Sequence, residues 1–143
     1  RKRDFIKNSG GDMISPARVE GELTLAPEIA QAMVVGDRRP FLAAIVVPDP
    51  EFAAQYAAQR GVACELPALA GDPDFHKAVS EAVTRINEGL PQTERVRRFV
   101  IAGEAFSVAN GQMTPTLKVR RHAVRDAYGA ALDSLYDGKG IAA

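Results

Sequence analysis

Two apolar runs separated by a short charged turn place the strongest constraint on the fold of this chain. Residues 29–35 and 41–47 are rich in valine, isoleucine and alanine, and each run has the length of a strand. Gly36-Asp37-Arg38-Arg39-Pro40 lies between them and favours a turn. Near-continuous apolar runs of this length are typical of strands buried on both faces. The two runs therefore predict a hairpin inside a core.

Three helix starts carry the same pair of signals, a capping side chain followed by proline at the first helical position. The pairs are Ser15-Pro16, Asp49-Pro50 and Asp72-Pro73. The third helix continues as an apolar stripe at spacings of three and four, and Pro91 stops it. The stripe consists of Phe75, Val79, Val83, Ile86 and Leu90.

The remaining segments complete an α+β fold. Residues 4–7 and 13–14 are expected to form short strands around a glycine turn, and residues 96–101 a third core strand. A last helix is expected from about Val119 to Tyr136. We therefore predict a small N-terminal β-hairpin followed by a three-stranded sheet packed with about four helices. The residues expected to face inward from the last helix are Val124, Ala127, Ala131 and Leu135.

The charge is balanced overall but unevenly distributed. The formal net charge is +0, which argues against a dedicated nucleic-acid binder. Basic residues gather in residues 1–7 and 118–125. If the fold brings these segments together, they form one basic face. Its arginines Arg120, Arg121 and Arg125 suit either a polyphosphate ligand or a solvated helix face.

The single cysteine, Cys64, cannot form an internal disulfide and is interpreted as a structural thiol, which fits a cytoplasmic protein. No apolar run reaches the length of a membrane span, and no signal peptide is visible. The chain begins with Arg1 rather than methionine, which suggests a piece of a longer protein.

Two short segments are candidate functional sites. MTPTLKVRR, residues 113–121, places Lys118 after a turn and before a helix, where an ammonium can meet an anion; a solvated surface lysine is the alternative. The turn Ser9-Gly10-Gly11 could let a ligand approach the backbone, or it could be a plain hairpin turn. It lacks the spacing of a nucleotide phosphate cradle.

No residue set in the sequence can run a reaction alone. His76, expected on an exposed helix face, and His122 have no carboxylate or cysteine at metal-ligand spacing, so no metal site is expected. A nucleophile elbow and a zinc-protease motif are both absent from the sequence. A lysine and a few arginines can only assist a reaction.

Together the two segments resemble the C-terminal subdomain of the adenylate-forming (AMP-forming) ligases, in the long-chain fatty acyl-CoA synthetase branch. Arg1-Lys2-Arg3-Asp4 resembles the hinge at which that subdomain begins, and residues 34–49 are similar to a run of that branch. The resemblance covers Arg1 to about Tyr136. It implies that residues 1–136 are the mobile lid of a ligase whose large N-terminal domain is absent, with a flexible tail at 137–143.

The resemblance also implies roles for individual residues. Lys118 matches the lysine that binds the acyl carboxylate and the α-phosphate during adenylation. Arg1 matches an arginine at the adenylate ribose and phosphate. Arg3 occupies the hinge position, where the family commonly has Asp or Lys. Ser9, Gly10 and Gly11 match the turn that lines the pantetheine tunnel. Leu117 stands where many members have glycine.

The reaction implied by the resemblance has two steps. A fatty acid and ATP give acyl-AMP and pyrophosphate, and the CoA thiolate then displaces AMP. ATP and Mg²⁺ would be bound mainly by the missing N-terminal domain, which is the expected partner, and this piece alone is expected to be inactive. A cytoplasmic location is expected, with peripheral association of the full-length enzyme at the inner membrane surface as an option.

Two alternatives stay open. An acyl-AMP ligase would pass its acyl group to a carrier protein rather than to CoA. A non-catalytic module would use the basic face to bind an anionic partner, although zero net charge weighs against it. The sequence does not give the acyl chain length or the oligomeric state.

Overall fold

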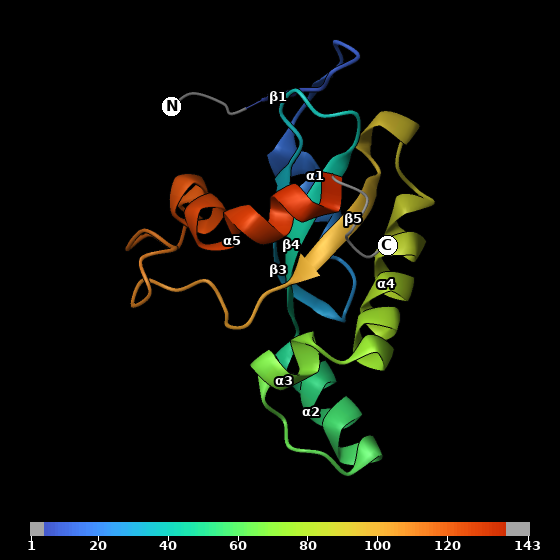
Figure 1. Ribbon diagram of the computed structural model, residues 1–143, viewed down its shortest axis with the longest axis vertical. Helices are drawn as coiled ribbons and strands as arrows, with labels where there is room; N and C mark the ends of the chain where they lie inside the picture. The colour runs from blue at the N-terminus through green and yellow to red at the C-terminus, as the bar shows by residue number, and fades with distance from the viewer. Residues whose placement is uncertain (1–4, 137–143) are drawn as a thin grey trace.

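A computed structural model describes residues 5–136 of the chain (Figure 1). The predicted α+β class is confirmed: an N-terminal hairpin precedes a three-stranded sheet, and helices pack on both sheet faces. The short helices α3 and η1 have no counterpart among the elements expected from the sequence. In chain order the elements are β1 (Ile6–Lys7), β2 (Met13–Ile14), α1 (Pro16–Leu23), β3 (Ile29–Val35), β4 (Leu42–Pro48), α2 (Pro50–Arg60), α3 (Leu66–Ala70), α4 (Pro73–Asn87), η1 (Gln92–Glu94), β5 (Val96–Ile101) and α5 (Arg121–Tyr136).

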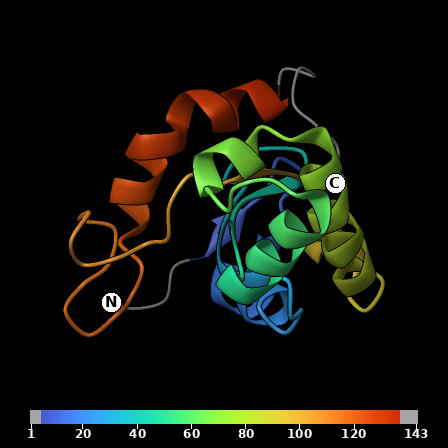
Figure 2. The same ribbon diagram turned by 90° about the horizontal axis from the view of Figure 1, so that it is seen from below.

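The sheet has the order β3-β4-β5, with β4 in the centre. Strand β4 pairs antiparallel with β3 and parallel with β5, so Ile45 lies between Met33 and Val100. Every residue of β4 is buried, because helices cover both faces. Leu42, Ala44 and Val46 belong to the core shared with α1 and α4, whereas the alternate residues Ala43, Ile45 and Val47 face the core shared with α5. Figure 1 shows the sheet between α5 and α4, and Figure 2 gives the same arrangement from below.

The three expected helix starts are capped as their sequences predict. Ser15, Asp49 and Asp72 each accept a hydrogen bond from a backbone N–H in the first turn, at 3.0–3.4 Å, and proline follows each cap. These side chains satisfy donors that the helix itself leaves unpaired. The caps therefore fix where α1, α2 and α4 begin.

The last helix differs from the expectation in its start and in its inward face. It begins at Arg121, because Val119 pairs with Met113 in an isolated β-bridge. Tyr128 has non-helical dihedrals (φ −115°, ψ 15°), so the two halves of α5 meet at a kink. Leu132, which is not among the expected inward residues, is buried, whereas Ala127, just before the kink, is exposed. Of the expected inward residues, Val124 and Leu135 are buried and Ala131 is half-buried.

The expected exposure of His76 is wrong. Its imidazole is only 7% exposed and stacks on Phe99 of β5, with ring centres 4.3 Å apart and planes inclined by 7°. Burial lowers the pKa of His76 below its ordinary value of 6.5. The apolar face of α4 is thus wider than the stripe read from the sequence. Cys64, interpreted as a structural thiol, is instead exposed.

Candidate functional site

The lysine of the MTPTLKVRR segment lies on a small closed loop. The N–H of Thr114 donates to the carbonyl of Lys118 at 2.8 Å, and the Leu117 N–H donates to the Thr114 carbonyl at 2.8 Å. The N–H of Lys118 donates to the Thr114 hydroxyl at 3.1 Å, and that hydroxyl lies 3.0 Å from the hydroxyl of Thr116. The Met113–Val119 bridge closes the base of the loop. The predicted turn is therefore present, with its backbone held at several points.

Lys118 itself is exposed, and its ammonium forms no ion pair with any carboxylate among residues 5–136. A fixed backbone thus carries a long, flexible cationic side chain into solvent. The residue before it, Leu117, has φ 66°, in the left-handed region, and is 67% exposed. Glycine at this position would adopt that conformation without a Cβ clash.

The glycine turn is organised by Asn8. The side-chain oxygen of Asn8 accepts hydrogen bonds from the N–H groups of Gly10 at 3.0 Å and Asp12 at 2.9 Å. Ser9, Gly10 and Gly11 are all exposed. Gly11 needs to be glycine for conformational reasons, because its φ is 90°.

Gly10 has no such need. Its φ is not positive, and a Cβ placed on it would meet nothing nearer than the Asn8 side-chain oxygen at 3.5 Å, an ordinary contact. The fold of the described residues therefore tolerates a side chain at position 10. No packing within the described residues requires glycine at position 10.

The hairpin that carries the glycine turn is hydrogen-bonded to the turn between β3 and β4. The Ser9 N–H donates to the Arg39 carbonyl at 2.9 Å, and the Arg38 N–H donates to the Lys7 carbonyl at 2.8 Å. The Lys7 N–H donates to a carboxylate oxygen of Asp37 at 3.3 Å. These bonds place the glycine turn relative to the sheet.

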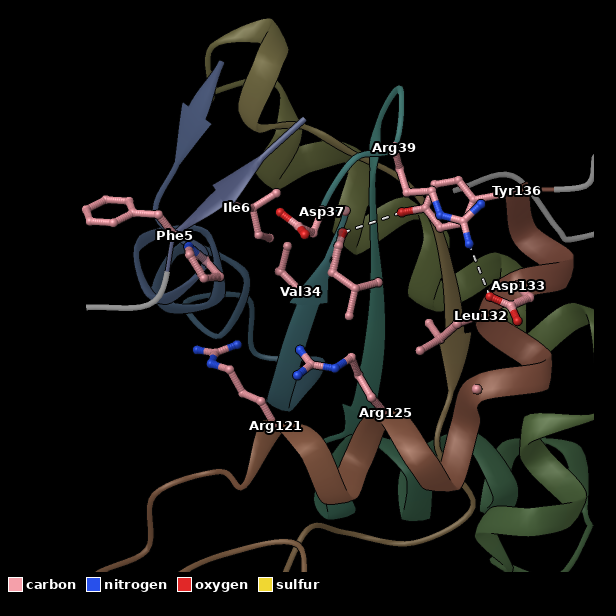
Figure 3. Close-up of a pocket in the computed structure, with 14 residues that line it drawn as sticks. Phe5, Ile6, Val34, Asp37, Arg39, Arg121, Arg125, Leu132, Asp133 and Tyr136 are labelled. Atoms are coloured by element: carbon pink, nitrogen blue, oxygen red, sulfur yellow. Dashed lines mark hydrogen bonds and ion pairs between the residues drawn. The ribbon is translucent and has the colours of Figure 1, made fainter. Parts of the chain in front are cut away.

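A cavity of about 500 Å³ separates the hairpin from α5 (Figure 3). Its wall combines apolar residues, including Phe5, Ile6 and Leu132, with three arginines and two aspartates. Phe5 and Ile6 of the first segment and Arg121 and Arg125 of the second line this cavity, whereas the basic residues at positions 1–3 lie outside the described residues. The charged members of the wall are Arg39, Arg121, Arg125, Asp37 and Asp133.

Two arginines of the predicted basic face, Arg120 and Arg121, and Arg39 of the turn between β3 and β4 are engaged within the chain. Arg121 forms two short bonds to the carboxylate of Glu20, at 2.6 and 2.7 Å, and both side chains are largely buried. Arg120 donates to the Gly111 carbonyl at 2.9 Å, and Arg39 pairs with Asp133 at 3.2 Å. Arg121 therefore fastens the start of α5 to α1, rather than offering a fork to an external phosphate.

The structure does not bring the two candidate segments together. Figure 1 shows the glycine turn at one end of the molecule, whereas the loop that precedes α5 projects from its side. Each loop is exposed to solvent. The arrangement suits two loops that act on different occasions. Arg1 and Arg3, matched to the nucleotide contact and the hinge, lie outside the described residues, as does the segment 137–143.

One cluster of aromatic and cationic side chains could not be expected from the sequence. The rings of Phe41 and Tyr136 stack with centres 4.8 Å apart, and the guanidinium of Arg39 lies 4.5 Å from the Tyr136 ring centre. Phe41 and Tyr136 are 95 residues apart in the sequence. The RRPF sequence of the turn offers cationic and aromatic side chains, but it does not indicate which helix they contact.

Within residues 5–136, no helix has both the length and the apolar character required to cross a bilayer. The same residues contain no group of three or more His, Cys, Asp or Glu side chains placed to hold a metal ion.

Comparison with known proteins gives consistent matches over nearly the whole chain. A model of the AMP-binding enzyme C-terminal domain matches residues 3–140. Long-chain-fatty-acid--CoA ligase FadD15 of Mycobacterium tuberculosis is 32% identical over 139 residues, which are 96% of this chain and 23% of that protein. Long-chain-fatty-acid--CoA ligase 1 of Cavia porcellus is 37% identical over 139 residues, which are 95% of this chain and 20% of that protein.

Solved structures give the same fold. The A-PCP didomain of carboxylic acid reductase from Segniliparus rugosus, in complex with AMP, superposes with a TM-score of 0.75 at 28% identity. The match covers 96% of this chain and 18% of that chain. The adenylation domain of a carboxylate reductase from Mycobacterium chelonae gives a TM-score of 0.74 at 25% identity, covering 93% of this chain and 19% of that chain. The chain thus spans about a fifth of the length of the proteins it matches.

Proposed function

Because this chain belongs to the family of AMP-binding enzyme C-terminal domains, we propose that it is the mobile subdomain of a long-chain fatty acid–CoA ligase. The full enzyme would convert a fatty acid and ATP to acyl-AMP, and then transfer the acyl group to CoA. The names of the curated relatives, which are long-chain fatty-acid–CoA ligases, support this reaction class. Within it, we assign the first step to Lys118 and the second to the glycine turn.

The observation that carries the proposal is the exposed Lys118 ammonium on a loop whose backbone is fixed. In adenylation a carboxylate approaches a phosphate that is already negative, and further charge builds on the phosphate oxygens. An ammonium between the two groups offsets that repulsion and orients the attack. The side chain has no acidic partner among the described residues to compete with such a ligand. The flexible stem suits a group that a moving domain delivers.

The second step is assigned to Ser9, Gly10 and Gly11. The exposed turn and the dispensable glycine at position 10 support a path in which the pantetheine arm of CoA passes over this backbone. The two loops project from different parts of the molecule, so one rigid unit would have to rotate to present each of them (Figure 1). We place the hinge at Arg3 and a nucleotide contact at Arg1.

The remaining ligands follow from the same assignment. ATP and CoA are the expected substrates of a ligase in this family. The described residues offer no carboxylate cluster for Mg²⁺, so we assign that ion to the large N-terminal domain, which is the expected partner of this chain. A cytoplasmic location, with peripheral membrane association of the full enzyme, completes the proposal.

Replacing the lysine tests the first assignment. In the full-length enzyme, Lys118→Ala should slow ATP-dependent pyrophosphate release by about 10²–10³, the usual cost of losing one preorganised donor. Transfer from supplied acyl-AMP to CoA should stay near the parent rate. Lys118→Arg should also adenylate poorly, because a planar fork does not replace a compact charge.

Lys77, an exposed lysine on α4, provides the matched control. Lys77→Ala should leave both half-reactions unchanged. Adenylation by Lys118→Ala at near the parent rate would reduce Lys118 to a surface residue, and the proposal would fail.

A second candidate function is acyl transfer to a carrier protein. It is favoured by the likeness, at a TM-score of 0.75, to the adenylation portion of an A-PCP didomain. The two candidate functions can be distinguished by giving the full-length enzyme its acyl-AMP with either CoA or a phosphopantetheinyl carrier protein. Thioester formed only on the carrier protein would favour the second candidate, whereas acyl-CoA would favour the first.

A further inference from the structure

The side chain of Arg39 joins the two parts of the molecule that the proposed function uses. It forms an ion pair with Asp133 at 3.2 Å and lies over the ring of Tyr136 at 4.5 Å, and both partners belong to the C-terminal half of α5 (Figure 3). The backbone carbonyl of the same residue accepts the hydrogen bond from the Ser9 N–H at 2.9 Å. Residue 39 is therefore bonded to α5 on one side and to the glycine turn on the other.

The C-terminal end of α5, which Arg39 contacts, is itself held in place by other bonds. The Tyr136 hydroxyl donates to the Phe41 carbonyl at 3.0 Å, and Arg98 donates to the Leu135 carbonyl at 2.9 Å. Burial raises the pKa of Tyr136 to about 12, so the hydroxyl stays protonated, and remains a donor, well into the alkaline range. The end of α5 is thus held to the sheet independently of Arg39.

We propose that Arg39 is a positioning residue for the thioester step, because its side chain fixes the carbonyl to which the glycine turn is hydrogen-bonded. This inference rests on the proposed function of that turn. The other bonds of the hairpin, from Arg38 and to Asp37, reach the same short turn, so the hairpin follows residues 37–39. Since α5 begins three residues after Lys118, one helix sets the position of both loops.

The chain contains a matched control for this arrangement. Arg60 lies over the ring of Tyr56 at 4.8 Å and pairs with Asp74 at 3.3 Å. Its side chain is 51% exposed, against 44% for Arg39. The same chemistry is therefore present on α2, where it joins α2 to α4 and has no bond to the glycine turn.

The test compares Arg39→Met with Arg60→Met in the full-length enzyme. Methionine keeps an apolar stem on the tyrosine but removes the ion pair and the cation–π contact. Arg39→Met should lower kcat/KM for CoA in the thioester half-reaction by about threefold to fivefold, the size expected for two exposed contacts of these kinds. Its pyrophosphate release should match the parent, and Arg60→Met should leave both half-reactions unchanged.

Amide hydrogen exchange gives a readout independent of activity. The Ser9 N–H should exchange about threefold to fivefold faster in Arg39→Met, because exchange follows the local opening of its bond to residue 39. It should be unchanged in Arg60→Met. Arg39→Lys, which keeps the charge but not the planar stacking group, should give an intermediate exchange rate and an intermediate kcat/KM.

Two results overturn the inference: equal loss in both half-reactions of Arg39→Met, or the same behaviour from both arginine variants. Gly10→Leu separates this inference from the function it rests on. If Gly10→Leu blocks the thioester step while Arg39→Met does not affect it, only the positioning role is lost. If Gly10→Leu leaves that step intact, the assigned function of the glycine turn fails as well.

Discussion

At Leu117 the backbone adopts φ 66°, where a Cβ costs about 1–2 kcal/mol in steric strain. The side chain is 67% exposed, so little packing offsets that cost. Glycine removes the strain, but it is more flexible in the unfolded chain, and the extra conformational entropy lost on folding costs about 0.5–1 kcal/mol. We therefore expect Leu117→Gly to raise the free energy of unfolding by about 0.5–1 kcal/mol, measured by urea denaturation.

Leu25 is the control for this prediction, because it is 70% exposed and does not have a positive φ. Leu25→Gly should therefore lower the free energy of unfolding. A loss of stability of equal size in both variants would show that position 117 is not strained.

Two adjacent glycines should respond differently to the same substitution. A Cβ at Gly10 meets nothing nearer than 3.5 Å and the turn is exposed, so Gly10→Leu should change the free energy of unfolding by less than about 0.5 kcal/mol, as is usual for surface substitutions. Gly11→Leu should lower it by about 1–2 kcal/mol, because φ at Gly11 is 90°.

In the full-length enzyme, Gly10→Leu should nevertheless slow transfer to CoA and spare adenylation. Equal losses in both half-reactions would point to a merely structural turn.

At the scale of elements, His76 makes the packing of α4 on β5 dependent on pH. Burial lowers its pKa, so the unfolded chain takes up a proton at a higher pH than the folded chain does. The stability gained from the neutral ring is complete above about pH 6.5 and is lost as the pH falls below that value. Among the described residues the Nε2 atom of His76 is buried without a hydrogen-bond partner, although a hydrogen bond with the Phe99 backbone partly offsets the effect of burial on the pKa of the ring.

His76→Phe should remove this pH dependence and keep a ring against Phe99. The free energy of unfolding of the variant should gain on that of the parent as the pH is lowered from about 7.5 to about 5, across the ordinary histidine range. Any cost of the larger ring cancels, because it does not vary with pH. A constant difference between the two proteins over that range would contradict the prediction.

At the scale of the whole molecule, two exposed loops project from one packed domain whose described residues offer little that could bind a nucleotide. The glycine turn lacks the spacing of a phosphate cradle, and Arg121 is engaged by Glu20. We expect residues 1–143 alone to fold, by circular dichroism, and to release no pyrophosphate from ATP and fatty acid. The full-length enzyme assayed in parallel is the reference, and ATP-dependent pyrophosphate release by the isolated piece would contradict the assignment.

Sequence signals that act over a few residues predicted much of the fold. Caps at Ser15, Asp49 and Asp72 act within one turn of helix, so the start of each helix could be read directly from the sequence. The burial of β4 on both faces followed from its unbroken apolar run. The lysine loop and the glycine turn were predicted for the same reason, because their hydrogen bonds connect residues only a few positions apart.

What the sequence could not predict depends on partners far along the chain. The kink at Tyr128 is followed directly by Gly129, but a glycine within a helical pattern does not by itself show that the helix will kink there. His76 is buried because β5 offers the ring of Phe99, whose position periodicity does not give. Arg39 finds Asp133 only when α5 crosses the sheet. Such contacts require the tertiary arrangement itself.

The mixed pairing of β4 has a consequence for synthesis on the ribosome. Its antiparallel neighbour β3 is made just before it, so one edge can pair at once. Its parallel neighbour β5 begins at Val96, 48 residues after the end of β4 at Pro48. At about 5–20 residues per second, the other edge of a fully apolar strand waits about 2–10 s for its partner. During that interval the nascent hairpin displays an open, hydrophobic strand edge, which is the part of this domain most in need of a chaperone.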